Sequence, residues 1–436
     1  MLAHTTYTQP FTLIIFGATG DLAKKKLFPD LFTLFRENRI SSKAKIIGYG
    51  RSPLSQEEFR EELRKEVWGA EEDKTLVQQF LSAISYTQGT YTDTNSISHL
   101  LEEHKKTLST LAPLLYYFAL PAHVVEQWST QLCHSTEKEI QPLFLIEKPF
   151  GTSEDHASEL FHHFMDCIGE KQLYLVDHYL GKSAVQSILH LRHANPILTH
   201  LLKGPYIEKI EIRALEKDDV ENRLGYYDKM GALKDMVQSH LLQLIALLLM
   251  DIPKTLDPTH MAREKAAILN ALLPDQTQPV YFGQYTGYGV VGSTTETSIK
   301  ATVRLDRSEW SHIPITLETG KKLKEKRTDI VITFKDTTQI NKNPNQIIIE
   351  IAPSESLKFT MTNHYNGFED TTPVEVATTS SLSCHGDDCL PEHGRLILEA
   401  LHKRKISFSS MEEVLAGWRL VAALEKIKEK IGIQTY

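Results

Sequence analysis

The stretch TLIIFGATGDLAKKKLF, residues 12–28, decides the fold of the N-terminal part of the chain. Its first five residues are apolar or β-branched, which favours a buried strand. The strand runs directly into Gly17 and Gly20, and a helical stretch follows. Small residues at this point let the backbone approach a pyrophosphate at the helix N-terminus. The spacing G-x-x-G-x-x-A therefore predicts a phosphate-binding turn; a plain structural turn is the alternative that this motif alone leaves open.

Five further strand-like runs follow before residue 178, and amphipathic stretches separate them. These runs are KIIGYG (45–50), ISYTQGTY (84–91), LLYYFAL (114–120), LFLIEK (143–148) and LYLVD (173–177). Strands that alternate with helices are typical of βαβ units and a mostly parallel sheet. We therefore predict an α/β doubly wound, Rossmann-like nucleotide-binding domain over residues 1–177.

Beyond residue 180 the pattern changes, because strand-like runs follow one another with few helices between them. These runs include IPITLET (313–319), DIVITF (329–334), NQIIIEI (345–351) and LKFTMT (357–362). Such a succession is typical of antiparallel strands. We predict an α+β domain with a large, mostly antiparallel sheet over residues 178–436. Helices are expected near 232–250, 261–273, 393–403 and 411–431, and a long surface loop at 363–393.

Composition excludes several classes of protein. The 436 residues carry a formal net charge of -8, which argues against general affinity for nucleic acid. No apolar run approaches the roughly 20 residues of a membrane-spanning helix, and the first residues resemble neither a secretory nor a transit signal. Four cysteines, at positions 133, 167, 384 and 389, form no disulfide or metal-ligand framework. We expect a cytoplasmic protein with reduced thiols and no bound metal.

The end of the second predicted strand indicates which nicotinamide coenzyme binds. An acidic residue there would hold the ribose 2′-hydroxyl of NAD and repel the 2′-phosphate of NADP. The chain has Gly48-Tyr49-Gly50-Arg51-Ser52 at this point, with no acid, and Arg51 can hold a phosphate. One of the lysines at 24–26 is expected to face the same anion. NADP is therefore favoured, with NAD as the weaker alternative.

Two polar clusters follow the fifth and sixth predicted strands. They are EKPFG, residues 147–151, and DHYLGK, residues 177–182. Open parallel sheets bind ligands beyond the carboxyl ends of their strands, which is where both clusters fall. A strand-end run that contains Asp, His, Tyr and Lys is costly as mere structure, so we interpret these residues as part of a ligand site.

With these motifs the chain resembles the glucose-6-phosphate dehydrogenase family over nearly its whole length. The DHYLGK run is the most specific of them, and the resemblance continues through DMVQSH (235–240), REK (263–265) and GWR (417–419). It implies a catalytic base at His240 and an orienting carboxylate at Asp177. It also implies two sets of contacts. The substrate residues would be Lys148, His178, Tyr179, Lys182, Glu216, Asp235, Lys321 and Lys326. The coenzyme residues would be Gly17, Thr19, Gly20, Asp21, Leu22, Lys26, Arg51 and Lys148.

These roles also make chemical sense. Oxidation of a hemiacetal carbon requires loss of the hydroxyl proton as the hydride leaves, and histidine is the natural acceptor near neutral pH. A neighbouring carboxylate fixes the histidine tautomer. The phosphate calls for a local cationic cluster, which Lys182 and His178 can supply.

The resemblance implies oxidation of glucose 6-phosphate to 6-phosphoglucono-1,5-lactone with NADP, the first step of the oxidative pentose phosphate pathway. It also implies a homodimer or homotetramer that associates through the large sheet. Two alternatives remain. One is another sugar oxidoreductase of the glucose-fructose oxidoreductase type, whose members lack the DHYLGK run. The other is a non-catalytic homologue that acts as an assembly partner and would have lost His240 or Lys182; both residues are present.

Overall fold

The chain folds into two compact units in a computed structural model, which describes residues 5–68, 73–90, 94–108, 112–135, 141–220, 223–336, 344–364, 371–382 and 389–436. The first unit comprises Met1–Lys182 and Leu390–Met411, and the second comprises Ser183–Cys389 and Glu412–Tyr436. The segment 390–411, which we predicted to belong to the second domain, is therefore part of the first unit. The predicted boundary at residue 177 stays a prediction.

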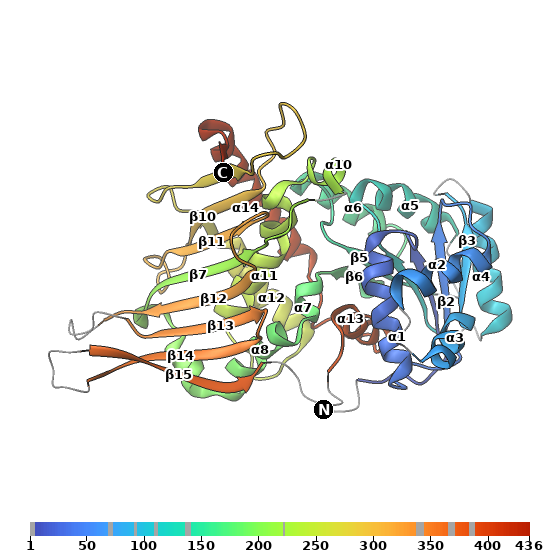
Figure 1. Cartoon of the computed structure of the whole chain (residues 1–436), viewed down its shortest axis with the longest axis horizontal. Helices are drawn as coiled ribbons and strands as arrows, with labels where there is room; N and C mark the ends of the chain where they lie inside the picture. Colours follow the sequence, from blue (N-terminus) through green and yellow to red (C-terminus); the bar gives the residue numbers. More distant parts are fainter. Residues whose placement is uncertain are drawn as a thin grey trace. The chain divides into compact units, whose positions relative to one another are not determined.

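The first unit is built around a six-stranded parallel sheet with the order β3-β2-β1-β4-β5-β6 (Figure 1). Its strands are β1 (Thr12–Phe16), β2 (Lys45–Gly50), β3 (Ile84–Gln88), β4 (Leu114–Phe118), β5 (Leu143–Glu147) and β6 (Leu173–Val176). Each begins where the sequence predicted a strand. The strand order reverses between β1 and β4, and open α/β sheets bind ligands at the carboxyl side of such a point.

Helices cover this sheet. They are the π-helix η2 (Ala23–Leu27), α1 (Phe28–Arg36), α2 (Gln56–Val67), α3 (Lys74–Ser82), α4 (Thr94–Thr107), α5 (Ala122–Ser135), α6 (Glu154–Met165), α7 (His178–Gly181) and α13 (Glu392–Leu401), with a short 3-10 turn η3 (Glu170–Gln172). The core on one face joins β1 and β2 to α1, α2 and α13 through buried Leu31, Phe59 and Ile397. A capping box begins α2, because the Ser55 hydroxyl accepts from the Glu58 amide while the Glu58 carboxylate accepts from the Ser55 amide.

The second unit contains a large mixed sheet with the order β15-β14-β13-β12-β7-β11-β10-β9-β16, and β8 pairs with β10. Among the described strands of this sheet, β7 with β11 and β9 with β16 form the parallel pairs. Its strands are β7 (Ile207–Leu215), β8 (Leu272–Pro274), β9 (Tyr281–Gln284), β10 (Ser298–Leu305), β11 (Ile315–Gly320), β12 (Arg327–Phe334), β13 (Gln346–Ala352), β14 (Ser356–His364), β15 (Thr371–Ser381) and β16 (Gln434–Thr435). The predicted large, mostly antiparallel sheet is confirmed.

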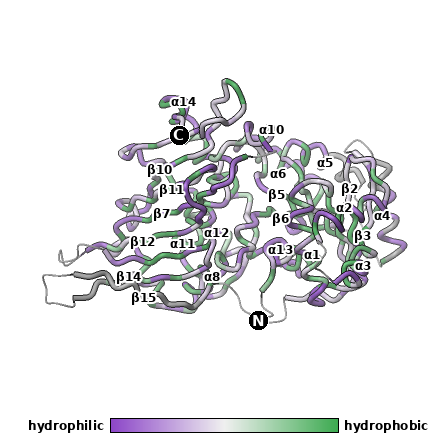
Figure 2. Tube along the Cα trace, viewed as in Figure 1, coloured by the Kyte–Doolittle hydropathy of each residue, from purple (hydrophilic) through white to green (hydrophobic). Residues whose placement is uncertain are grey.

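The second unit also contains helices, some of which contact its sheet at β7, β11 and β13. They are α8 (Ser183–Ala194), α9 (Pro196–Leu201), η4 (Gly204–Tyr206), α10 (Leu224–Tyr227), the π-helix η6 (Leu233–Leu241), α11 (Leu242–Leu249), α12 (Pro258–Asn270) and α14 (Met411–Ile431). Buried and half-buried residues alternate along β13, as expected for a sheet with one covered face. Figure 2 shows both hydrophobic and hydrophilic stretches on the strands of this sheet. All eight residues of α11, which lies within the helix predicted near 232–250, are buried.

Two expectations are wrong. The predicted loop at 363–393 contains the strand β15, which pairs with β14; residues 365–370 and 383–388 of that loop lie outside the described residues. Cys167 and Cys389 are each disulfide-bonded, so the expectation of reduced thiols fails for these two. In the described ranges, no helix combines the length and apolar character needed to cross a membrane.

Candidate active site

The predicted phosphate-binding turn connects β1 to η2. Gly17 has a φ of +86°, and a side chain there would place Cβ 2.6 Å from the carbonyl oxygen of Ala119, so both conformation and space require glycine. The Gly20 amide donates to the Gly17 carbonyl at 2.9 Å, which closes the turn. The first helical turns after Asp21 and Leu22 are π-helical rather than the expected α-helix. This geometry leaves the backbone open to a nucleotide phosphate.

Arg51 lies beside this turn. The hydroxyl of its neighbour Ser52 donates to Thr19 Oγ1 at 3.4 Å, so the end of β2 and the turn are adjacent. The Arg51 side chain is exposed. The position and chemistry of Arg51 therefore suit a phosphate carried by a nucleotide bound at the turn.

The three lysines that follow the turn are all paired with carboxylates. Lys24 lies 3.1 Å from Glu62 and 3.0 Å from Glu66, and Lys25 lies 3.1 Å from Asp21. Lys26 lies 3.4 Å from Glu392 and keeps 54% of its side chain exposed. A nucleotide phosphate must therefore compete with a carboxylate for Lys26.

The EKPFG segment follows β5. Glu147 is 7% exposed, and its Oε1 accepts a 2.5 Å hydrogen bond from the hydroxyl of Tyr117 on β4. Burial raises the pKa of Glu147, and the nearby His393 and Tyr117 oppose that rise. Lys148 comes next and is half-buried. Gly151 ends the segment with a φ of +77° and packs against Ala157 so closely that no side chain fits.

The DHYLGK run forms the short helix α7 at the end of β6. Asp177 is 1% exposed, and its Oδ1 caps the helix by accepting from the Tyr179 amide at 3.0 Å. The His178 and Tyr179 rings meet edge to face at 5.2 Å. The Lys182 ammonium lies over the Tyr179 ring at 5.1 Å and 3.0 Å from Glu392. The structure thus gathers His178, Tyr179 and the Lys182 ammonium in one polar cluster, which we call the α7 cluster.

Glu392 and His393, at the start of α13, complete this cluster, and the sequence pattern did not single them out. The His393 ring stacks on that of His178, with centroids 5.7 Å apart and planes 10° apart. Burial opposes ionisation of Glu392, but Lys182, His393 and Lys26 together lower its pKa. No local signal identifies these residues, because more than 200 positions separate them from α7 in the sequence.

A second group of predicted residues lies in the second unit. Glu216 follows β7 and Lys321 follows β11, and these strands are parallel neighbours, so their carboxyl ends meet. The Lys321 ammonium lies 2.6 Å from Glu216 Oε2. The same ammonium lies 5.5 Å from the ring of Tyr227, which the sequence did not single out. Lys326 lies apart from this pair, in an exposed contact of 3.6 Å with Asp218.

The electrostatic surroundings of Tyr227 show which carboxylates lie near Lys321 and Glu216. Its side chain is buried, and burial raises its pKa well above the usual value. The carboxylates of Asp235, Glu296 and Glu216 raise the pKa further. Asp235, Glu216 and Lys321 therefore lie around one phenol, in a polar group that offers both donors and acceptors to a sugar.

His240 lies in the π-helix η6 and is 1% exposed. In a π-helix, hydrogen bonds join residues five apart, so Asp235 and His240 are separated by one turn. Such helices are rare and occur frequently at functional sites. The sequence LKDMVQSHL gives no signal of this geometry, and it predicts an ordinary helix. Asp177 belongs to the first unit and His240 to the second.

The N-terminus of η6 is held by Glu296, which precedes β10. Glu296 is 1% exposed; its Oε1 accepts from the Leu233 amide at 2.9 Å and its Oε2 from the Lys428 ammonium at 2.6 Å. The carbonyl of the adjacent Thr297 accepts from the Lys321 amide at 2.9 Å. Glu296 and Thr297 thereby connect the helix that carries His240 to the strand end that carries Lys321.

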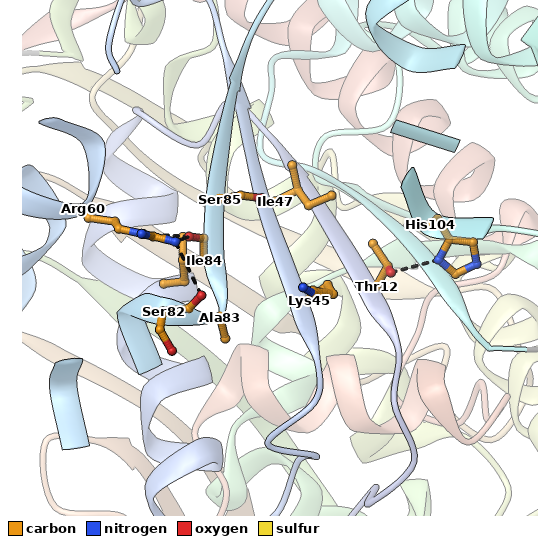
Figure 3. Close-up of a pocket in the computed structure, with 9 residues that line it drawn as sticks. All are labelled: Thr12, Lys45, Ile47, Arg60, Ser82, Ala83, Ile84, Ser85 and His104. Carbon is orange, nitrogen blue, oxygen red and sulfur yellow. Dashed lines mark hydrogen bonds between the residues drawn. The ribbon is translucent and has the colours of Figure 1, made fainter. Parts of the chain in front are cut away.

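A small cavity of about 120 Å³ lies at the opposite, amino end of the first sheet (Figure 3). Its wall includes Lys45, Arg60 and His104, and none of the predicted site residues lines it. The Arg60 guanidinium is bound to the carbonyl oxygens of Ile84 and Ser82. This cavity is therefore separate from the predicted coenzyme and substrate residues.

Comparisons with known proteins agree on one family. Residues 14–187 match the family model described as glucose-6-phosphate dehydrogenase, NAD binding domain, and residues 189–436 match the model of its C-terminal domain. Glucose-6-phosphate 1-dehydrogenase 5, cytoplasmic, of Arabidopsis thaliana is 32% identical over 96% of this chain and 86% of its own length. The Bacillus subtilis glucose-6-phosphate 1-dehydrogenase is 32% identical over 97% of this chain and 92% of its own.

A solved structure is similar over almost the full length. It is a glucose-6-phosphate dehydrogenase in complex with its substrate glucose-6-phosphate. The TM-score is 0.87 at 28% sequence identity, with 99% of this chain and 95% of that chain covered.

Proposed function

The chain belongs to the glucose-6-phosphate dehydrogenase family, and from this premise we propose how its own residues carry out the family's reaction, the oxidation of glucose 6-phosphate at C1 with NADP as hydride acceptor. The proposal assigns a base, a phosphate site, a sugar site and a coenzyme site to named residues. The product is 6-phosphoglucono-1,5-lactone.

His240 acts as the base that takes the C1 hydroxyl proton. A buried imidazole keeps a defined orientation, and histidine accepts a proton near neutral pH. Asp177 orients His240 and stabilises the imidazolium that forms. Because Asp177 is itself fixed by the cap on Tyr179, its carboxylate has little freedom to turn away.

His178, Tyr179 and Lys182 hold the substrate phosphate. The stacked His178 ring and the Lys182 ammonium over Tyr179 are already arranged around one short helix, so few rotamers are lost when the anion binds. In the absence of phosphate, Glu392 satisfies Lys182. A phosphate dianion carries more charge and more acceptor oxygens than a carboxylate, which favours the exchange.

Glu216, Asp235, Lys321, Lys326 and Lys148 contact the sugar. Paired carboxylates and ammonium groups can accept from and donate to the hydroxyls of a hexose. Lys326 is the outermost of the five, since its contact with Asp218 is exposed.

The coenzyme binds on the turn of Gly17 to Leu22, and Arg51 holds its 2′-phosphate. Gly17 supports this assignment, because a Cβ would fill the space beside Ala119 that the turn keeps open. Lys26 and Lys148 supply further positive charge near the phosphates and the nicotinamide. When bound, the coenzyme supplies the hydride acceptor; the protein supplies the base and the orientation.

The observation that most strongly supports this function is the α7 cluster, in which a buried carboxylate and a set of cations follow one strand end. The test is absorbance at 340 nm with glucose 6-phosphate and either NADP or NAD. We expect reduction of NADP at lower coenzyme concentration than NAD. No absorbance change with either coenzyme would contradict the proposed function.

We further propose that copies of the chain associate into a homodimer or homotetramer through the large sheet of the second unit. Light scattering after gel filtration would measure the assembly, and a monomer at micromolar concentration would contradict it. A cytoplasmic location is proposed by analogy with the plant relative; cell fractionation would test it.

A further inference from the structure

His393 is an ionisable side chain enclosed by carboxylates, and the proposed reaction does not use it. The residue is 1% exposed. Its Nδ1 lies 3.5 Å from Asp30 Oδ2 and 3.9 Å from Glu392 Oε1, and its Nε2 lies 3.7 Å from Glu147 Oε1. Three carboxylates from three elements, α1, β5 and α13, therefore surround one imidazole.

Each of these carboxylates has a second role that fixes its position. Asp30 accepts from the amides of His393 and Gly394 at 2.9 and 3.2 Å, at the start of α13. Glu147 accepts from the Tyr117 hydroxyl. Glu392 pairs with Lys182 and Lys26. The carboxylates cannot leave the imidazole without breaking these contacts.

A positive charge on His393 is what this enclosure favours. Burial by itself would lower the pKa of His393, but Asp30, Glu147 and Glu392 outweigh burial and raise it above the usual value. The other groups that face the cluster are the stacked ring of His178, the phenol of Tyr117, and Lys148 and Asp177 through Glu147. The protonated His393 ring is therefore the positive charge that lies between the three carboxylates.

Glu392 connects this charge to the proposed phosphate site. One of its oxygens lies 3.9 Å from His393 and the other 3.0 Å from Lys182. A phosphate that binds Lys182 competes with this carboxylate for the ammonium. Loss of the Lys182 contact costs Glu392 less free energy when the His393 imidazolium remains beside it. The Glu392 carboxylate is then not left buried and unpaired.

We propose that His393 is a positioning residue for phosphate recognition: as an imidazolium it holds Glu392 when phosphate takes Lys182, and its stacked ring fixes the orientation of His178. This inference rests on the proposed function, since it assumes that Lys182 and His178 bind the phosphate of glucose 6-phosphate. It assigns to His393 no proton transfer to substrate or coenzyme.

The direction of the pH effect follows from the raised pKa. His393 is charged below its pKa in the folded protein, which lies above the unfolded value near 6.5. Its contribution to stability and to phosphate binding is therefore complete below about pH 6.5 and is lost as pH rises through the folded value. The second ionisation of a sugar phosphate, near pH 6, has the opposite effect on binding, because the dianion is held more strongly by cations as pH rises.

The experiment compares the wild type with His393→Gln, Glu392→Gln and the double variant, by kcat and KM for glucose 6-phosphate between about pH 6 and 9. We expect His393→Gln to raise this KM about tenfold at neutral pH, with kcat within about twofold. The rise in wild-type KM with pH should be absent in this variant. Adding Glu392→Gln should restore most of the affinity, because it removes the carboxylate that competes for Lys182.

A merely structural role predicts different results. If His393 only packs the core, His393→Gln lowers the melting temperature, leaves the KM and its pH profile unchanged and is not rescued; this overturns the inference. His402→Gln, at the other end of α13, is the matched control and should change neither quantity. If His393→Gln does not fold, Glu392→Gln alone tests the inference. Its KM for glucose 6-phosphate must then depend less on pH than that of the wild type, and an unchanged dependence overturns the inference.

The same measurements separate this inference from the proposed function. Lys182→Ala tests the phosphate site itself. A raised KM in Lys182→Ala with an unchanged KM in His393→Gln overturns only the role of His393. An unchanged KM in Lys182→Ala overturns the phosphate site, and the role of His393 falls with it.

Discussion

His240 carries the proton-transfer step of the proposed reaction. His240→Asn keeps the approximate size and hydrogen bonding of the side chain but cannot take a proton at neutral pH. We expect kcat to fall by roughly 10² to 10⁴ while the affinity for glucose 6-phosphate changes little. Steady-state rates together with direct substrate binding by calorimetry measure both quantities.

Asp177→Asn is the companion variant, and its rate should fall less, because His240 can still accept a proton without its orienting partner. If glucose 6-phosphate affinity collapses together with the rate in His240→Asn, the residue is a ligand contact or a core residue, and the assignment as base is wrong.

Arg51 is the residue that we propose determines the choice between coenzymes. Arg51→Ala should weaken NADP binding by about 1.5 to 3 kcal/mol, the value of a hydrogen bond to a charged group, and leave NAD nearly unchanged. Fluorescence titration with each coenzyme measures the two affinities. Equal loss for both would show that Arg51 supports the strand end rather than the 2′-phosphate, and a lowered melting temperature would accompany it.

At the scale of elements, η6 depends on the carboxylate that holds its first turn. Glu296→Ala leaves the Leu233 amide and the Lys428 ammonium without their acceptor in a buried place. We expect a loss of about 3 to 5 kcal/mol in unfolding free energy, as for a broken buried ion pair. Because η6 also carries Asp235 and His240, kcat should fall in the protein that remains folded.

Chemical denaturation gives the stability, and Glu318→Gln is the matched control for Glu296→Ala. Glu318 pairs with Lys300 at 3.0 Å on the same sheet, but at the surface, so its loss should stay within about 1 kcal/mol. Similar losses in the two variants would contradict the role of Glu296.

The elements differ in how much of them could be predicted from the sequence. The strands β1 to β6 are buried parallel strands, and these appear as continuous apolar runs such as TLIIF. The strand β15 has the sequence TTPVEVATTSS, which contains Pro373 and few apolar residues, so a loop was the natural interpretation. It is an edge strand, where proline is tolerated.

Only those parts of the candidate site that form contiguous motifs could be predicted from the sequence. The glycine turn and the DHYLGK run are contiguous, and contiguous residues can be recognised together. The contacts of Lys26 and Lys182 with Glu392 depend on the return of the segment 390–411 to the first unit. No periodicity within that segment indicates where it packs, and the same holds for the π-helical geometry of η6.

At the scale of the whole molecule, a protein with a formal net charge of -8 must bind a sugar phosphate and a coenzyme that are both anions. Cations close to the binding site must therefore make the local electrostatic potential positive, although the net charge of the protein is negative. The α7 cluster is where the first unit concentrates such charge, in Lys182 beside His178. Specificity for the phosphorylated sugar over the free sugar is the property of the enzyme that follows from this cluster.

The ratio of kcat/KM for glucose 6-phosphate to that for free glucose, in the wild type and in Lys182→Ala, tests this claim most directly. Several charge-assisted bonds of roughly 1.5 to 3 kcal/mol each make the ratio large in the wild type. Lys182→Ala should raise the KM for glucose 6-phosphate at least tenfold and leave the feeble activity on glucose almost unchanged, because that activity never uses the phosphate site. An equal reduction with both sugars would contradict the proposed phosphate site.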